Sequence, residues 1–99
     1  MTPNKTRENI VKRAKLERDY AEYLANQWQR EVQVICKIQD KVNNSKGNPI
    51  MEEVGQCNQE LLKLSTAIMT GFKMAADGLT AYMEIEQMLY NQLNQEEGE

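Results

Sequence analysis

Apolar residues recur at seven-residue spacing along almost the whole chain, and only one short segment breaks the rhythm. In the first half, neither glycine nor proline interrupts the pattern between residues 6 and 42. One line of the repeat consists of Ala14, Ala21, Trp28, Ile35 and Val42. A second line consists of Ile10, Leu24 and Ile38, interrupted by Glu17 and Glu31. Because strand-like alternation is absent, this spacing predicts one long amphipathic helix over about residues 5–43.

The only segment with the composition of a loop lies between residues 43 and 49 and reads Asn-Asn-Ser-Lys-Gly-Asn-Pro. Gly47 is a candidate C-cap, Asn48 is a candidate N-cap, and Pro49 suits the first position of a second helix. A signal that ends a helix is therefore followed at once by one that starts a helix. We expect a loop over about residues 44–48, a second helix over 49–95 and a frayed acidic tail at 96–99.

The second half repeats the same rhythm with more apolar residues than one contact line can use. We predict contact with the first helix along two lines, Val54, Leu61, Ile68, Ala75, Tyr82 and Leu89, and Cys57, Leu64, Gly71, Gly78 and Ile85. A further line consists of Leu62, Met69, Ala76, Met83 and Tyr90, with Phe72 and Leu79 beside it. The best place for a break is Asp77-Gly78, with Thr80 as a new N-cap. An isolated glycine costs a helix only about 1 kcal/mol, so we favour a continuous helix.

Charge is divided unequally between the two halves. Residues 1–46 hold ten Lys or Arg and six Asp or Glu, whereas residues 47–99 hold two Lys and nine Asp or Glu. Two long helices and a short loop predict an all-α fold, a long antiparallel helical hairpin in a single domain over 1–99. Residues whose numbers add to about 93 then lie side by side, so that the basic first helix meets the acidic end of the second. The same register places Trp28 opposite Ser65.

A hairpin of two helices has a single contact line, which leaves part of the second helix uncovered. Each large apolar side chain left in water forgoes about 1.5–3 kcal/mol. We therefore expect a second layer, supplied by a second copy in a dimeric four-helix bundle or by another protein. Methionine is frequent in the second half, as it is in surfaces that accept partner helices. The residues expected to bind this partner are Leu62, Met69, Phe72, Leu79, Met83 and Trp28.

The composition offers little material for catalysis. The chain has no histidine, and it contains neither a Gly-rich phosphate loop nor a nucleophile motif. We expect no enzyme activity, no cofactor and no bound metal ion. The predicted function is that of a non-enzymatic protein–protein interaction module of the chaperone, adaptor or inhibitor type.

The two cysteines, Cys36 and Cys57, also have numbers that add to 93 and are expected at the same height in the hairpin. One interpretation is a redox-controlled clamp, or a metal site in a dimer that pools four thiols. We favour two buried, inert thiols, because two cysteines do not form a disulfide framework. A chain without a signal peptide is expected in the reducing cytoplasm.

An alternative function is the binding of a small ligand, a nucleotide or a lipid, in a pocket between two protomers. Lys12 and Lys15 would hold a phosphate there, and Tyr20 and Tyr23 would stack on a base or grip the phosphate. We expect no nucleic-acid partner, because the pI is about 5.1 and no aromatic residues are interleaved with the basic run. We also expect no membrane partner, because the longest apolar run is three residues.

The segment Tyr82-Met-Glu-Ile-Glu86 resembles the C-terminal Tyr-x-x-x-Asp/Glu export signal of the WXG100 proteins. These are small secreted helical hairpins of about this length, so the resemblance implies a secreted hairpin as a further alternative. The Trp-x-Gly turn of that family has no counterpart here, because the loop reads Ser45-Lys-Gly-Asn-Pro49. This departure puts membership of the family in doubt.

Overall fold

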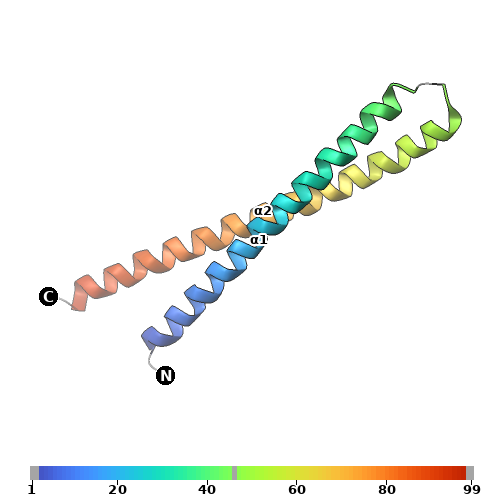
Figure 1. The fold of residues 1–99 in the computed structure, drawn as a ribbon. Coiled ribbons are helices and arrows are strands. Elements are labelled where there is room, and N and C mark those ends of the chain that lie inside the picture. Colours follow the sequence, from blue (N-terminus) through green and yellow to red (C-terminus); the bar gives the residue numbers. More distant parts are fainter. Residues whose placement is uncertain (1–2, 46, 98–99) are drawn as a thin grey trace. The chain divides into compact units, whose positions relative to one another are not determined.

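The computed structural model describes residues 3–45 and 47–97, which form two helices and the connection between them (Figure 1). Helix α1 runs over Pro3–Asn43 (41 residues) and helix α2 over Pro49–Glu97 (49 residues). This confirms the predicted all-α helical hairpin, and no strand occurs in the described residues. The loop-side ends of both helices match the prediction, whereas α1 begins at Pro3 and α2 continues to Glu97, so the first two positions of the expected frayed tail are helical. Positions 98–99 of that tail lie outside the described residues.

Helix α2 is continuous through Asp77-Gly78, the place where the sequence allowed a break. The hydroxyl of Thr80, the candidate for a new N-cap, instead donates to the carbonyl oxygen of Ala76 at 3.0 Å. An N-cap hydroxyl would accept a hydrogen bond from a free backbone N–H, whereas a threonine inside a helix donates to the carbonyl one turn back. The bond therefore marks Thr80 as an interior residue of the helix.

The contacts of the chain divide it into two compact units. The terminal unit comprises residues 3–22 and 73–97, and the loop unit comprises residues 23–45 and 47–72. Within each unit, a segment of α1 lies beside an antiparallel segment of α2. Arg7 pairs with Glu86 in the terminal unit, and Asn58 binds the backbone of Ile35 in the loop unit. The residue numbers of both pairs add to 93, which confirms the predicted register.

The start of α2 is capped as predicted. The side-chain oxygen Oδ1 of Asn48 accepts hydrogen bonds from the backbone N–H groups of Ile50 (3.0 Å) and Met51 (3.3 Å). Pro49 occupies the first helical position, where the missing N–H of proline costs nothing. These residues fix the point at which the chain turns back.

The end of α1 differs from the prediction that Gly47 is its C-cap. Gly47 does adopt a left-handed backbone, with φ of 93°, but the helix has already ended at Asn43. The last carbonyls of α1 are satisfied instead by Ser45, whose hydroxyl donates to Lys41 O and whose N–H donates to Val42 O, both at 3.0 Å. Gly47 therefore serves the turn and not the helix end.

The face of α1 that meets α2 was only half predicted. The line through Ala14, Ala21, Trp28, Ile35 and Val42 is buried or half-buried, as expected. Its companion line consists of Val11, Arg18, Ala25, Val32 and Gln39. Of the predicted companions, Leu24 is half-buried, whereas Ile10 and Ile38 are exposed, and so are the two glutamates expected to interrupt them, Glu17 and Glu31. The prediction followed hydrophobicity, whereas the long stems of Arg18 and Gln39 can cover apolar surface while their polar ends stay at its edge.

The predicted contact face of α2 was wrong. Apart from the half-buried Ile68, the two predicted contact lines are exposed along their whole length. The residues that are buried or half-buried are Met51, Gly55, Asn58, Leu62, Ser65, Ile68, Met69, Phe72, Ala76, Leu79, Thr80, Met83, Glu86 and Tyr90. The line through Leu62, Met69, Ala76, Met83 and Tyr90, which was expected to remain uncovered, therefore packs against α1. The uncovered surface lies on the two lines that were predicted to make this contact.

Small residues explain why this face of α2 is the inner one. A Cβ atom placed on Gly55 would lie 2.8 Å from Cγ1 of Val42, so the two helices meet closely at this point of the loop unit. The buried residues of the terminal unit are likewise small, namely Ala14, Ala21 and Ala76. Small side chains let two helices approach closely, and this close approach allows the interior to pack at high density. The result is a thin core that leaves most of the large aliphatic side chains outside.

Candidate interaction surface

A stripe of large aliphatic side chains runs along the exposed side of α2 in the loop unit. Ile50, Val54, Leu61 and Leu64 are between 42% and 72% exposed. Their spacing follows the alternating intervals of four and three residues that a helix uses to contact another helix, with Cys57 in the same series. The stripe thus has the residue spacing of a helix-packing seam, although its side chains remain exposed beside α1.

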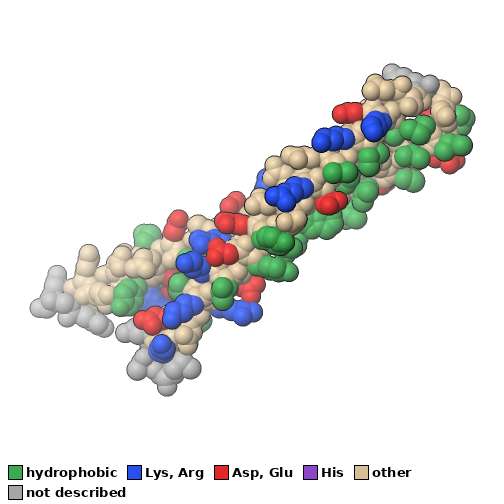
Figure 2. Space-filling view, in the orientation of Figure 1, with side chains coloured by type: hydrophobic (Ala, Val, Ile, Leu, Met, Phe, Trp, Pro, Cys, Tyr) green, Lys and Arg blue, Asp and Glu red, His purple; other side chains and the backbone are tan. Residues whose placement is uncertain are grey.

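Helix α1 adds a second wall to this stripe. Val34 and Ile38 are about half exposed, and Ile38 lies with the α2 residues around a shallow hollow of about 480 Å³. The hollow is lined by Ile38, Ile50, Glu53, Val54, Cys57, Asn58 and Leu61. Figure 2 shows hydrophobic side chains gathered along the loop unit, with basic side chains of α1 beside them. We call this surface, extended by Val34 and Leu64, the apolar groove.

The chemistry of the apolar groove suits an apolar partner. Glu53, on its edge, is the charged residue among those that line the hollow, and the polar Asn58 has both hydrogens of its amide bonded. No methionine lines it, so the Met-rich character expected from the sequence does not describe this surface. The exposed methionines of α2 are Met74 and Met88, both in the terminal unit.

The five α2 residues predicted to bind a partner occupy a different position from the one expected. Leu62, Met69, Phe72, Leu79, Met83 and Trp28 are all half-buried on the faces that pack within the units. Whether any of them contacts a partner remains a prediction. The periodicity that indicated an uncovered surface was correct, but Val54, Cys57, Leu61 and Leu64 were assigned to the inside and the five α2 residues to the outside. Trp28 was expected on the inner line of α1, where it lies.

The two thiols are free, as expected, but both are exposed and not buried. The register puts Cys36 and Cys57 at the same height of the loop unit, yet they lie on different sides. Ile35 faces α2, and at about 100° per residue Val34 lies to one side of it and Cys36 to the other. Val34 is on the side of the groove, so Cys57 lines the groove while Cys36 lies outside it.

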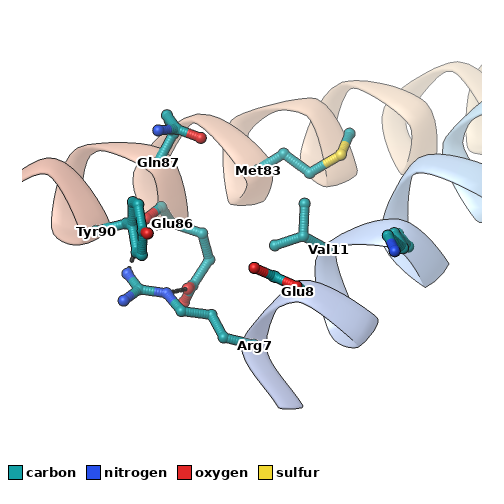
Figure 3. Close-up of a pocket in the computed structure, with 8 residues that line it drawn as sticks. Arg7, Glu8, Val11, Met83, Glu86, Gln87 and Tyr90 are labelled. Carbon is teal, nitrogen blue, oxygen red and sulfur yellow. Dashed lines mark hydrogen bonds and ion pairs between the residues drawn. The ribbon is translucent and has the colours of Figure 1, made fainter. Parts of the chain in front are cut away.

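A second hollow, of about 300 Å³, lies in the terminal unit and is lined by residues of both helices (Figure 3). Nε of Arg7 lies 2.7 Å from Oε2 of Glu86, and a second nitrogen of its guanidinium donates to the Glu86 carbonyl oxygen at 2.8 Å. The guanidinium also lies 5.4 Å from the centre of the Tyr90 ring. The charge of Arg7 is thus engaged within the molecule, as the complementary halves predicted.

The residues suggested for a small ligand are spread over both units. Lys12 lines the hollow beside Arg7 and Tyr90, whereas Lys15 and Tyr20 are exposed elsewhere on α1. Tyr23, which is also exposed, belongs to the loop unit. Ligand binding by these residues remains a prediction. The glutamate of the WXG100-like segment, Glu86, is half-buried in its ion pair with Arg7.

Neither a metal-binding cluster nor a membrane-spanning helix occurs in the described part of the chain. No three His, Cys, Asp or Glu side chains of residues 3–45 and 47–97 come close enough together to hold a metal ion. Within the same ranges, no helical stretch is both long and apolar enough to cross a bilayer. The chain matches no protein-family model, no curated protein and no solved structure.

Proposed function

We propose that this chain is a non-enzymatic protein–protein interaction module that docks a partner helix in the apolar groove of the loop unit. The observation that carries the proposal is the seam-like spacing of Ile50, Val54, Cys57, Leu61 and Leu64 on an exposed helix face. A chaperone, an adaptor and an inhibitor would all use such a surface.

The size of the exposed apolar surface supports docking over chance exposure. Single exposed leucines are common and need no explanation, but a continuous row with a second wall marks an interaction surface. Burying the side chains of Ile50, Leu61 and Leu64 would stabilise a complex by about 1.5–3 kcal/mol each if they were fully exposed beforehand. Their partial exposure reduces this gain, and several such residues together still support a stable complex.

The partner of a two-helix groove is expected to be helical. An amphipathic helix that enters such a groove covers both walls at once, with its own apolar residues spaced at three and four. A pair of helices from another hairpin does the same and completes a four-helix bundle. The second layer expected from the sequence thus remains part of the proposal, and the groove gives it a place.

Photo-crosslinking in cells tests the proposal by comparing crosslink yields at groove positions with the yield at a position outside the groove. A photoreactive amino acid is introduced in place of Leu61 or Leu64, and the control carries it at Gln56, an exposed residue on the other side of α2. We expect crosslinks to protein at 61 and 64 and none of comparable yield at 56. Equal yields at all three positions, or none at any, would contradict docking in the groove.

A further inference from the structure

We infer that the occupant of the apolar groove is a second copy of this chain, held groove to groove with both loops at the same end. This inference rests on the proposed function and adds to it the identity and the orientation of the partner. It depends on the charges that border the groove and on the surface that the chain leaves uncovered.

Near the loop, the two edges of the groove carry opposite charge, at Lys41 on α1 and at Glu53 on α2, while the exposed Glu31 lies farther along the Ile38 line of α1. On α1, Lys41 follows Ile38 by one turn and shares a helix line with Val34, seven residues earlier, and it is exposed. On α2, Glu53 borders the groove next to Val54 and is also exposed. The numbers of Lys41 and Glu53 add to nearly 93, so the register puts them at the same height on opposite edges.

Two copies can meet groove to groove around a two-fold axis in two ways. If the axis runs along the helices, the loops share one end, and the α1 segment of each loop unit packs against the α2 segment of the other. If the axis runs across the helices, the loops point in opposite directions, and each segment packs against its own counterpart.

The edge charges favour the first arrangement. It brings the Lys41 end of the α1 edge of one copy to the Glu53 edge of its partner's α2, and symmetry repeats this contact on the other side. Lys41 of each chain then lies at the height of Glu53 in the other. The second arrangement sets the α1 edge, which holds both Lys41 and Glu31, against its own counterpart, and sets Glu53 on α2 against the acidic edge of the other copy. Opposite charges across an interface fix its register, and like charges in the same place oppose it.

The chain as a whole exposes more surface than a compact protein of its mass. The accessible surface of the chain is 7730 Å². A compact monomer of the same mass exposes about 5,800 Å², so the excess is about 1,900 Å². A stable interface of standard size covers about 800 Å² on each partner. Counted over both units, the excess is larger than the area that one partner of such an interface covers.

Charge reversal in the full-length chain tests both the partner and the orientation. We would measure the dissociation constant of the dimer by sedimentation equilibrium for the unchanged chain, Lys41→Glu, Glu53→Lys and the double variant. Each single reversal turns two attractive contacts into repulsive ones because of the symmetry. We expect each to weaken the dimer about tenfold. The double variant restores attraction, and we expect its dissociation constant to return to within about threefold of the original.

The control and the outcomes separate the possible failures. Lys73→Glu makes the same charge change on an exposed residue of the terminal unit and should leave the dimer unaffected. An unchanged or tighter dimer in Lys41→Glu would contradict the orientation. A monomeric chain at every concentration would contradict the second copy as the occupant. If such a monomeric chain still forms crosslinks at positions 61 and 64 in cells, the proposed function stands and only the inference of a second copy fails. If the crosslinks are absent as well, both the proposed function and this inference are contradicted.

Discussion

The side-chain amide nitrogen of Asn58 lies 3.0 Å from the carbonyl oxygen of Ile35, across the interface of the loop unit. Its other hydrogen is donated to Oε1 of Gln39, also at 3.0 Å. Asn58 is buried, so its amide has these protein acceptors in place of water. A polar residue in a helical seam can specify one register among several that apolar packing would allow. Asn58 thus helps to fix the height at which groove residues of the two helices meet.

Replacing Asn58 by alanine should lower the free energy of unfolding by about 1 kcal/mol, because two buried hydrogen bonds are lost. Urea denaturation followed by circular dichroism measures this change. Asn26→Ala, at an exposed position of α1, is the matched control and should stabilise slightly, because alanine favours helix over asparagine. Equal effects at both positions would show that the buried amide contributes nothing.

Two glycines of α2 should respond in opposite directions to the same substitution. Gly55→Ala places its new Cβ at 2.8 Å from Cγ1 of Val42, so the Val42 side chain or the helices must shift, and we expect a loss of about 1–3 kcal/mol. At Gly71 nothing lies within 4 Å of the same atom. Gly71→Ala should therefore stabilise the helix by up to about 1 kcal/mol. Thermal unfolding of both variants checks the signs, and a stabilised Gly55→Ala would refute the close approach.

The ion pair of Arg7 and Glu86 should be worth more than an ordinary surface pair. Both side chains are only about a fifth exposed, and the atoms lie 2.7 Å apart. A double-mutant cycle of Arg7→Ala and Glu86→Ala, followed by urea denaturation, should give a coupling of about 1 kcal/mol that falls with added salt.

The pair of Arg13 and Glu17 is the built-in control for this cycle. Its side chains are 76% and 50% exposed at a similar separation of 3.0 Å. An exposed pair four residues apart on a helix couples by only about 0.3–0.5 kcal/mol. A coupling for Arg7 and Glu86 no larger than this would mean that partial burial adds nothing to the pair.

Ser65 should be more stable as alanine. Its side chain is 1% exposed, and its hydroxyl has no hydrogen-bond partner among the described residues. Ser65→Ala removes a buried polar group that makes no bond, so we expect a gain of about 1 kcal/mol. Thr66→Ala, at the neighbouring exposed position, corrects for helix propensity. A destabilised Ser65→Ala would indicate that the hydroxyl is bonded after all, for example by a bound water molecule.

The helices, the loop and the register could all be predicted from the sequence, because each depends on local chemistry or on simple counting. Asn48 and Pro49 mark the start of α2 whatever packs against it. Once two helices are joined at a short loop, the position of the turn fixes which residues share a height. The pairing of Arg7 with Glu86, which are 79 residues apart in the sequence, agrees with that count.

The inner face of α2 could not be predicted in the same way. A seven-residue period shows that a line of residues lies on one side of a helix, but α2 has two such lines of comparable period. Hydrophobicity favoured Val54, Leu61 and Leu64 for the inner face. The close contact of Gly55 with Val42 favours the other line, because small side chains allow helices to meet. Which line faces α1 depends on how well the two helices fit together. The spacing of residues along one helix carries no information about that fit.

The differential reactivity of the two native thiols tests the docking surface most directly. Cys57 lines the apolar groove and Cys36 lies outside it, and both are exposed in the isolated chain. Alkylation rates of both thiols would be measured by mass spectrometry, in dilute purified protein and in intact cells that make it. We predict comparable rates in the dilute protein and, in cells, a Cys57 rate that falls relative to that of Cys36. The same ratio of rates in cells as in dilute solution would show that nothing occupies the groove and would contradict the account.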